Sequence, residues 1–217
     1  MKYKTYETIT SGWWDSINWT RGLEFIDKNK SSSFLNKKIL EIGGQNADMS
    51  LWAAKSGGIV ICSDIINEND LHIKAKNLMK KYFITYENIN ALDIPYENKF
   101  DFVLFKSVLG GIGRKGNREK HYRVINEIYK SLKKGGELLF IENMQGSFIH
   151  EIIRNKYGAG KNDWLYPSYE NFISYSKRFH KIKYKTFGIF SVDCKNDKQQ
   201  LLRLFVNAKL DDWLKVR

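Results

Sequence analysis

The sequence predicts an α/β fold, in which one open and mostly parallel sheet carries helices on both faces. Two observations predict it: short apolar runs recur between residues 38 and 141, and segments with helical spacing of apolar residues separate most of them. Strands that alternate with helices pair in parallel through right-handed crossovers. A chain of 217 residues is long enough to form this fold as one domain with a substantial core.

The predicted elements follow one another in the order that such a sheet needs. The third helix has apolar positions at clear helical spacing, and glycine pairs at 57–58 and 135–136 end the first and third helices. The strands are predicted at Lys38–Ile42, Ile59–Ser63, within Tyr82–Ile89, and at Asp101–Phe105 and Glu137–Ile141, and the helices at Met49–Lys55, Asp70–Lys81 and Asn117–Leu132.

The two ends of the chain differ from this central part. Residues 1–35 are predicted to be an N-terminal extension or lid of a single domain that spans residues 1–217. After the fifth strand, Ser168–Phe179 is a predicted helix with Ser168 as its N-cap. Lys181–Phe187 and Leu201–Val206 have the pattern of strands. The segment between them is too short for a crossover helix, so an antiparallel pair is expected at the C-terminal edge of the sheet.

The formal net charge of +12 suits several kinds of partner. Nucleic acid, an anionic membrane surface and a phosphorylated substrate all attract basic proteins. Most of the lysines are scattered singly or in pairs, however, and the densest basic tract, Lys177–Lys185, alternates with apolar residues like a half-exposed strand. We therefore interpret the charge as a solvated surface, and nucleic acid is not the favoured partner.

The cysteines and the hydropathy pattern indicate a cytoplasmic protein. Cys62 lies within an apolar run and Cys194 lies far from it in the sequence, which favours reduced thiols over a disulfide framework. No segment has the roughly 18 consecutive apolar residues of a membrane-spanning helix. The first residues, Met-Lys-Tyr-Lys-Thr-Tyr, contain no signal-peptide core.

Residues 39–64 have the pattern of a nucleotide-binding unit: an apolar run, two glycines, a helix, and a second apolar run closed by Asp64. A dinucleotide-binding loop needs glycine at three positions, which are occupied here by Gly43, Gln45 and Asp48. A carboxylate at the third position would repel a pyrophosphate, and no phosphate-binding lysine motif is present. NAD and ATP are therefore disfavoured, whereas an adenosine ligand that carries a cation is compatible with this loop.

Several motifs resemble those of the class I S-adenosylmethionine (SAM)-dependent methyltransferases. Residues 40–47, Leu-Glu-Ile-Gly-Gly-Gln-Asn-Ala, resemble the first motif of the family, with Gln45 and Ala47 departing from its Gly-x-Gly-x-Gly pattern. Residues 90–95, Asn-Ala-Leu-Asp-Ile-Pro, are similar to the family's Asp-Ala-x-x-Leu-Pro segment. Phe100–Leu104 and Leu132–Gly136 resemble its fourth strand and the turn before the fifth. The resemblance covers most of the chain and implies a Rossmann-like fold with SAM as the cofactor.

The resemblance also implies which residues contact the cofactor. Asp64 is in the position of the family's acidic residue, which binds both ribose hydroxyls. Asn90 replaces the family's aspartate and is expected to accept a hydrogen bond from the adenine amino group, with a backbone contact at Ala91. The remaining predicted cofactor contacts lie at the ends of the first, second and fourth strands: Glu41, Gly43, Gly44, Ile65 and Lys106. No metal site is predicted.

Residues that follow the fifth strand are the candidates for catalysis. Methyl transfer from sulfur needs mainly positioning, but a hydroxyl acceptor benefits from a base that takes its proton. Glu142 and His150 are the candidates for this general base, and His121 is a third.

The motifs that are missing narrow the acceptor. The sequence has no Asn-Pro-Pro-Tyr or Asp-Pro-Pro-Tyr tetrapeptide and no Pro-Cys pair, which mark enzymes that methylate amino groups and cytosine C5. It loosely resembles small-molecule methyltransferases of surface-polysaccharide and secondary-metabolite pathways. The expected acceptor is therefore a hydroxyl of a sugar or a related polar metabolite. Aromatic residues suited to stack on a sugar, or equally to fill the core, are Trp13, Trp14, Trp19, Trp164 and Tyr166.

Two alternatives remain open at this point. The net charge supports an RNA methyltransferase, whose affinity for RNA would fall steeply with salt. The irregular glycine loop supports a catalytically silent module that binds a partner. Binding of SAM and an assay of methyl transfer separate the silent module from both enzymes.

Overall fold

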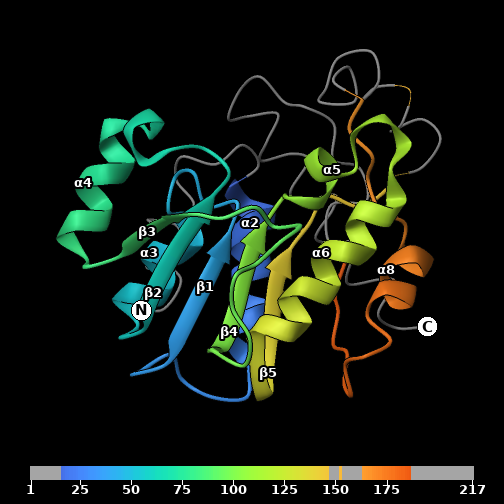
Figure 1. The fold of residues 1–217 in the computed structure, drawn as a ribbon. Coiled ribbons are helices and arrows are strands. Elements are labelled where there is room, and N and C mark those ends of the chain that lie inside the picture. The colour runs from blue at the N-terminus through green and yellow to red at the C-terminus, as the bar shows by residue number, and fades with distance from the viewer. Residues whose placement is uncertain (1–15, 147–151, 153–162, 187–217) are drawn as a thin grey trace.

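The computed structural model describes residues 16–146, residue 152 and residues 163–186. Its centre is a five-stranded sheet in the order β3-β2-β1-β4-β5, and all four strand pairs are parallel (Figure 1). The predicted α/β fold with a mostly parallel sheet is confirmed. The strands are β1 Lys38–Ile42, β2 Ile59–Asp64, β3 Thr85–Asn88, β4 Phe100–Lys106 and β5 Leu132–Ile141.

Helices α6 and α8 begin where the sequence provides a side-chain cap. The Oδ1 atom of Asn117 accepts a hydrogen bond from the backbone N–H of Lys120 at the start of α6. Ser168, the predicted N-cap, accepts one from the N–H of Asn171 at the start of α8. The α-helices are α2 Ser16–Asn29, α3 Asp48–Lys55, α4 Ile73–Lys81, α5 Leu109–Ile112, α6 Arg118–Ser131 and α8 Tyr169–Tyr175, and the 3₁₀ turns are η1 Glu68–Asp70 and η2 Arg114–Gly116.

The sheet separates two hydrophobic cores, because successive side chains of a strand point to opposite faces. In β1, Ile39 packs into the core beneath α2, α3 and α4, and Leu40 packs into the core beneath α5, α6 and α8. Both faces of the sheet are therefore covered by helices (Figure 1). None of the helices in the described residues combines the length and the apolar character that crossing a membrane requires.

Helix α2 belongs to the first core. Trp19 is 5% exposed and packs with Leu23 and Ile26 against the sheet. A Cβ atom at Gly22 would lie 2.8 Å from Cδ1 of Ile141, so the helix approaches β5 closely at this glycine. Trp19 therefore fills the core, while Trp13 and Trp14 lie outside the described residues. The single-domain boundary of 1–217 stays a prediction.

The predicted antiparallel strand pair is not found in the described part of the chain. Residues 181–186 have no strand conformation, and Leu201–Val206 lies outside the described residues. Side-chain contacts hold the first of these segments instead: Nζ of Lys183 donates to the carbonyl oxygen of Asn29, and the rings of Tyr184 and Tyr169 are 4.9 Å apart. The alternation of lysine with apolar residues predicted a strand here. In the structure the same side chains contact α2 and α8 instead.

Candidate functional site

The loop between β1 and α3 lies at the carboxyl end of β1. The strand order reverses at this strand, because β2 and β3 lie on one side of it and β4 and β5 lie on the other. Gly43 has a positive φ of 67°, and the N–H of Gly44 donates to the carbonyl oxygen of Ser63 in β2. The N–H of Ala47 closes the loop by donating to the carbonyl oxygen of Gly44 at 2.7 Å. This is the place in an open α/β sheet at which ligands bind.

Neither glycine of the loop has room for a side chain. A Cβ atom at Gly43 would lie 2.6 Å from Cγ2 of Val108, and one at Gly44 would lie 2.6 Å from Sγ of Cys62. Gly43 therefore contacts the segment after β4, and Gly44 contacts β2. The two glycines let this loop, called the cradle below, pack closely against β2 and against the segment after β4.

Glu41 supports the loop from below. Its side chain is buried, with 2% of the residue exposed, and accepts hydrogen bonds from the backbone N–H groups of Met49 and Ser50 in the first turn of α3. Burial raises the pKa of this carboxyl. Cys62 is a buried free thiol whose Sγ donates to the carbonyl oxygen of Gly44. The geometry favours an indirect role for Glu41, in which it shapes the loop, and its direct contact with a cofactor stays a prediction.

Asp64 lies at the carboxyl end of β2 with its side chain half-buried. Its Oδ1 atom accepts a hydrogen bond from the N–H of Ile65 at 2.7 Å, and its Oδ2 atom has no hydrogen-bond partner among the described residues. Ile65 is 69% exposed. The amide of Asn88 donates to the carbonyl oxygens of Ile65 and Ile66 and fixes this turn. A free carboxylate oxygen and an exposed apolar side chain are therefore adjacent here.

Asn90 shapes the loop after β3. Its side-chain oxygen accepts from the N–H of Leu92 at 3.0 Å, and its carbonyl oxygen accepts from the N–H of Asp93. Nε of Arg123, in α6, donates to the carbonyl oxygen of Leu92 and holds the loop from outside. The side-chain oxygen of Asn90 keeps a second lone pair, so the predicted contacts of Asn90 and Ala91 with adenine stay predictions.

Lys106, the last residue of β4, is paired with the first turn of α3. Its Nζ atom lies 3.2 Å from Oδ2 of Asp48 and 5.4 Å from the centre of the Trp19 ring. Asp48 is the carboxylate that disfavoured a pyrophosphate in the sequence analysis. The ion pair joins β4 to the glycine loop, and a contact between Lys106 and a cofactor stays a prediction.

Glu142 follows β5 directly and bonds to the segment after β4. Its Oε2 atom accepts from the N–H groups of Val108 at 2.9 Å and Leu109 at 2.8 Å, and Oε1 accepts from the N–H of Asn143. Burial raises the pKa of Glu142 to about 7, against the opposing effect of these three hydrogen bonds. A carboxyl group that titrates near neutral pH at a strand end has the property of a general base.

Ser107 and Asn143 were not singled out by the sequence analysis. Nδ2 of Asn143 donates to Oγ of Ser107 at 2.6 Å, so the two residues that follow β4 and β5 are joined. Ser107 has a positive φ of 57°, which is uncommon for residues other than glycine and occurs often at functional sites. The signal in the sequence was their position close to the ends of two strands, since Ser107 is the first residue after β4 and Asn143 the second after β5.

The two histidines of the catalytic prediction have different outcomes. His150 lies outside the described residues, and its role stays a prediction. His121 is completely buried, and its Nε2 atom is 2.7 Å from the carbonyl oxygen of Leu109. An imidazole in this position is not placed to take a proton from an acceptor, so the structure corrects the assignment of His121 as a third candidate base.

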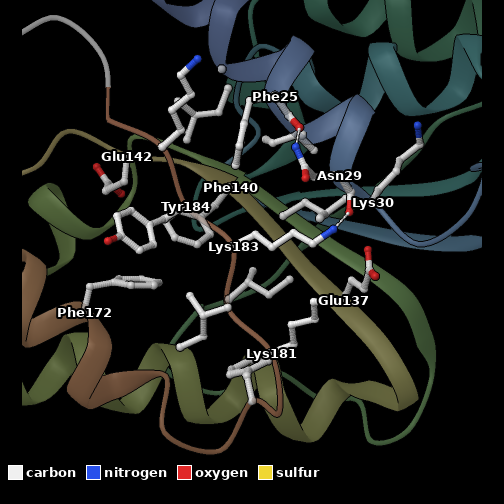
Figure 2. Close-up of a pocket in the computed structure, with 18 of the residues that line it drawn as sticks. Phe25, Asn29, Lys30, Glu137, Phe140, Glu142, Phe172, Lys181, Lys183 and Tyr184 are labelled. Atoms are coloured by element: carbon white, nitrogen blue, oxygen red, sulfur yellow. Dashed lines mark hydrogen bonds between the residues drawn. The ribbon is translucent and has the colours of Figure 1, made fainter. Parts of the chain in front are cut away.

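A hollow of about 1840 Å³ runs along β5 between α2 and residues 178–186. Glu142 lies toward one end of it and Glu137 toward the other (Figure 2), and the rings of Phe140, Phe172 and Tyr184 also line it. Ser107, Asn143, Trp164 and Tyr166 also line it, whereas Gly43, Asp64 and Asn90 do not. The site therefore has two parts: the loops after β1, β2 and β3, and a region of polar residues after β4 and β5 that opens into the hollow.

The donor set does not indicate a metal centre. Among the residues that the structure describes, His, Cys, Asp and Glu form no group of three or more that is arranged to hold a metal ion.

Comparison with known proteins finds a similarity in the central part of the chain. A family model described as a methyltransferase domain matches residues 40–140, and no curated protein sequence matches the chain. One similar solved structure is an S-adenosylmethionine-dependent methyltransferase from Mesorhizobium loti, with 15% identity and a TM-score of 0.63, over 91% of this chain and 94% of that protein.

Two further structures are similar over a smaller share of their own length. Phosphoethanolamine N-methyltransferase 2 from Haemonchus contortus, in complex with S-adenosyl-L-methionine, has 18% identity and a TM-score of 0.61, over 99% of this chain and 48% of that protein. The YcgJ protein from Bacillus subtilis has 13% identity and a TM-score of 0.58, over 72% of this chain and 66% of that protein. At these identities the likeness is one of fold.

Proposed function

We propose that this chain, in which residues 40–140 form a methyltransferase domain of the class I SAM-dependent type, transfers a methyl group to a hydroxyl of a small polar acceptor such as a sugar. SAM supplies the methyl group on a sulfonium ion. The chain supplies a binding cradle, a place for the acceptor and a group that can take a proton. Each of these is supported by a separate part of the site.

The loops after β1, β2 and β3 fit the cofactor. The cradle of Gly43 and Gly44 lies at the carboxyl end of β1, where open α/β sheets bind ligands, and it packs closely on Val108 and Cys62. Oδ2 of Asp64 is available to accept from a ribose hydroxyl, and Ile65 offers an exposed apolar face beside it. Asp48, paired with Lys106, places a carboxylate in the first turn of α3, which disfavours a phosphate beside this loop and agrees with a phosphate-free ligand.

The observation that carries the acceptor proposal is the position of Glu142. Its carboxyl group lies at the end of the hollow, beside the joined Ser107 and Asn143, and its pKa of about 7 makes it a base in the neutral range. A hydroxyl bound against Ser107 and Asn143 would be within the same region as this carboxylate. Glu142 would then hold the proton that the hydroxyl loses as the methyl group arrives.

The test is an assay of methyl transfer from isotopically labelled SAM to a panel of acceptors. The panel contains polyhydroxylated sugars, RNA, and phosphoethanolamine, a substrate suggested by the Haemonchus contortus protein. We expect transfer to a hydroxyl compound, at a rate that rises with pH and levels off above about pH 7. Binding of S-adenosylhomocysteine without transfer to any member of the panel would favour the silent module.

The contribution of Glu142 is tested by Glu142→Gln. The glutamine side-chain oxygen can still accept from Val108 and Leu109, so the loop after β4 keeps its anchor. We expect turnover to fall at least about a hundredfold, which is the usual effect of removing a general base, while affinity for S-adenosylhomocysteine changes little. Turnover within a few-fold of wild type would move the search for the base to His150.

RNA is the second candidate acceptor, and basic side chains along the hollow favour it. Several of them are already paired, since Lys30, Lys130 and Lys133 contact Asp27, Glu127 and Asp101 respectively. If RNA is the acceptor, its affinity should fall steeply between low and physiological salt. The lysines and arginine that line the hollow are Lys28, Lys30, Lys130, Lys133, Lys134, Arg178, Lys181, Lys183 and Lys185.

A further inference from the structure

We infer that His121 is a positioning residue of the methyl-transfer site: with Glu142 it holds the backbone of Leu109 and so fixes Val108 against the cofactor loop. The inference rests on the proposed function for its meaning, because the loop that Val108 contacts is the proposed SAM cradle. It assigns to a buried histidine a role that involves neither acid nor base chemistry.

The tautomer of His121 follows from its partner. The carbonyl oxygen of Leu109 can only accept, so Nε2 of His121 carries the hydrogen and donates it at 2.7 Å. Nδ1 then has a lone pair, and it is buried without a partner among the described residues. Burial lowers the pKa of the imidazole, which favours the neutral ring.

Gly113 keeps the ring in position. A Cβ atom at Gly113 would lie 2.2 Å from Nε2 of His121, so the imidazole packs directly on the glycine backbone. The N–H of Gly113 also donates to the carbonyl oxygen of Leu109 at 2.9 Å. The carbonyl oxygen of Leu109 thus accepts two hydrogen bonds, one from the imidazole of His121 and one from the N–H of Gly113. The φ of Gly113 is −77°, which any residue adopts, so space alone requires glycine here.

The other backbone group of Leu109 is held from β5. Its N–H donates to Oε2 of Glu142 at 2.8 Å, and the same oxygen accepts from Val108 at 2.9 Å. A helix of four residues such as α5 is not stable by itself, because helix initiation is unfavourable and few internal hydrogen bonds follow. His121 from α6 and Glu142 from β5 therefore supply the anchors that α5 lacks.

Val108 connects these anchors to the cofactor loop. A Cβ atom at Gly43 would lie 2.6 Å from Cγ2 of Val108, so the valine side chain fills the space beside this glycine. A shift of Leu109 moves Val108, its neighbour in the chain, and so changes the packing around Gly43. His121 consequently acts on the cofactor loop through two residues that it helps to position.

Two pairs of variants test the inference. His121→Phe keeps a ring but removes the donor, whereas His121→Gln keeps a donor that can reach Leu109. Gly113→Ala displaces the imidazole, whereas Gly111→Ala adds a methyl group that would meet Trp164 only at an ordinary contact of 3.6 Å. The measurements are calorimetric titration with S-adenosylhomocysteine and amide hydrogen exchange of residues 107–113 in the ligand-free protein.

We expect His121→Phe and Gly113→Ala to bind S-adenosylhomocysteine about tenfold more weakly, the usual effect of losing one buried hydrogen bond. Both should exchange the amides of Val108 and Leu109 faster than wild type. His121→Gln and Gly111→Ala should resemble wild type in both measurements. If exchange at Val108 and Leu109 is unchanged in both His121→Phe and Gly113→Ala, the inference is wrong.

The same data separate this inference from the proposed function. Wild-type protein that does not bind S-adenosylhomocysteine would contradict the proposed function, and the exchange measurement would still decide whether His121 anchors Leu109. Conversely, tight binding that neither variant weakens would leave the cofactor assignment intact and overturn the role of His121. Thermal unfolding of each variant serves as the control for a general loss of structure.

Discussion

Glu142 couples the proton equilibrium of one carboxyl group to the stability of the protein. Burial raises its pKa from 4.5 to about 7 in the folded state. Between these two pH values the folded protein binds more protons than the unfolded chain, so the free energy of unfolding falls as the pH rises. This loss of stability is absent below the unfolded pKa and complete above the folded pKa, where it amounts to about 3 kcal/mol.

Glu142→Gln removes this titration and leaves the other carboxyl groups of the protein in place. We expect the difference in melting temperature, wild type minus Glu142→Gln, to increase as the pH is lowered from 7 to 5. The measurement is thermal unfolding followed by circular dichroism at a series of pH values. Curves for the two proteins that run parallel over this range would show that Glu142 does not titrate as proposed.

Asp64 is the residue whose removal should affect the cofactor most directly. Its Oδ2 atom is available for the ribose, and a hydrogen bond to a charged group contributes about 1.5–3 kcal/mol. Asp64→Ala should therefore weaken binding of S-adenosylhomocysteine at least about tenfold with little change in melting temperature. Asp70→Ala, which removes an exposed carboxylate from η1, is the matched control. A variant that melts much earlier but binds normally would show that Asp64 is structural.

At the scale of elements, Gly43 joins the first loop to the segment after β4. Gly43 and Gly116 have similar positive φ values, 67° and 75°, so alanine is strained at both positions. Only at Gly43 would the new methyl group also meet another residue, Val108. The difference between the two variants therefore isolates this contact from the backbone strain.

We expect Gly43→Ala to lose measurable binding of S-adenosylhomocysteine, and Gly116→Ala to bind as wild type with a stability loss of about 1 kcal/mol from the strained backbone. Calorimetry and urea unfolding provide the two quantities. Equal binding by the two variants would mean that the space between Gly43 and Val108 has no influence on the cofactor.

The sequence was sufficient to locate the elements of the sheet because local patterns determine them. The apolar runs at Lys38–Ile42 and Ile59–Ser63 correspond to β1 and β2 within one residue, and Ser168 caps α8 as predicted. Local patterns failed at residues 181–186, where contacts of Lys183 and Tyr184 with distant helices replace strand pairing. Alternation of polar and apolar residues shows that one side of a segment is exposed and the other is buried. It does not show whether a strand or a helix covers the buried side.

The candidate site was less accessible to prediction, for a related reason. The positions of Asp64 and Glu142 at strand ends follow from the order of the elements. The hydrogen bonds from Val108 and Leu109 to Glu142, and from Asn143 to Ser107, join residues far apart in the sequence. Such contacts depend on strand order and register, so the buried role of His121 was visible only once α5 and α6 were placed.

For the whole molecule, the cofactor should act as a stabiliser because its proposed contacts lie at the ends of several strands. A ligand at a hundred times its dissociation constant adds about 2.7 kcal/mol to the free energy of unfolding. For a domain of this size that corresponds to a rise in melting temperature of roughly 5–10 °C. We expect this rise with S-adenosylhomocysteine and none with NAD, measured by thermal unfolding. A shift with NAD alone would contradict the cofactor assignment.

The pairing of β1 with β4 joins Ile39 to Phe102, although β2 and β3 lie between them in the chain. During translation the ribosome therefore releases β1, β2 and β3 before the strand that completes the middle of the sheet. Until β4 emerges, one edge of the apolar β1 has no partner, and a nascent chain in this state is open to chaperones and to misassociation. Val108, which packs beside Gly43, follows β4 in the chain, so the glycine loop also lacks this packing partner until β4 has emerged.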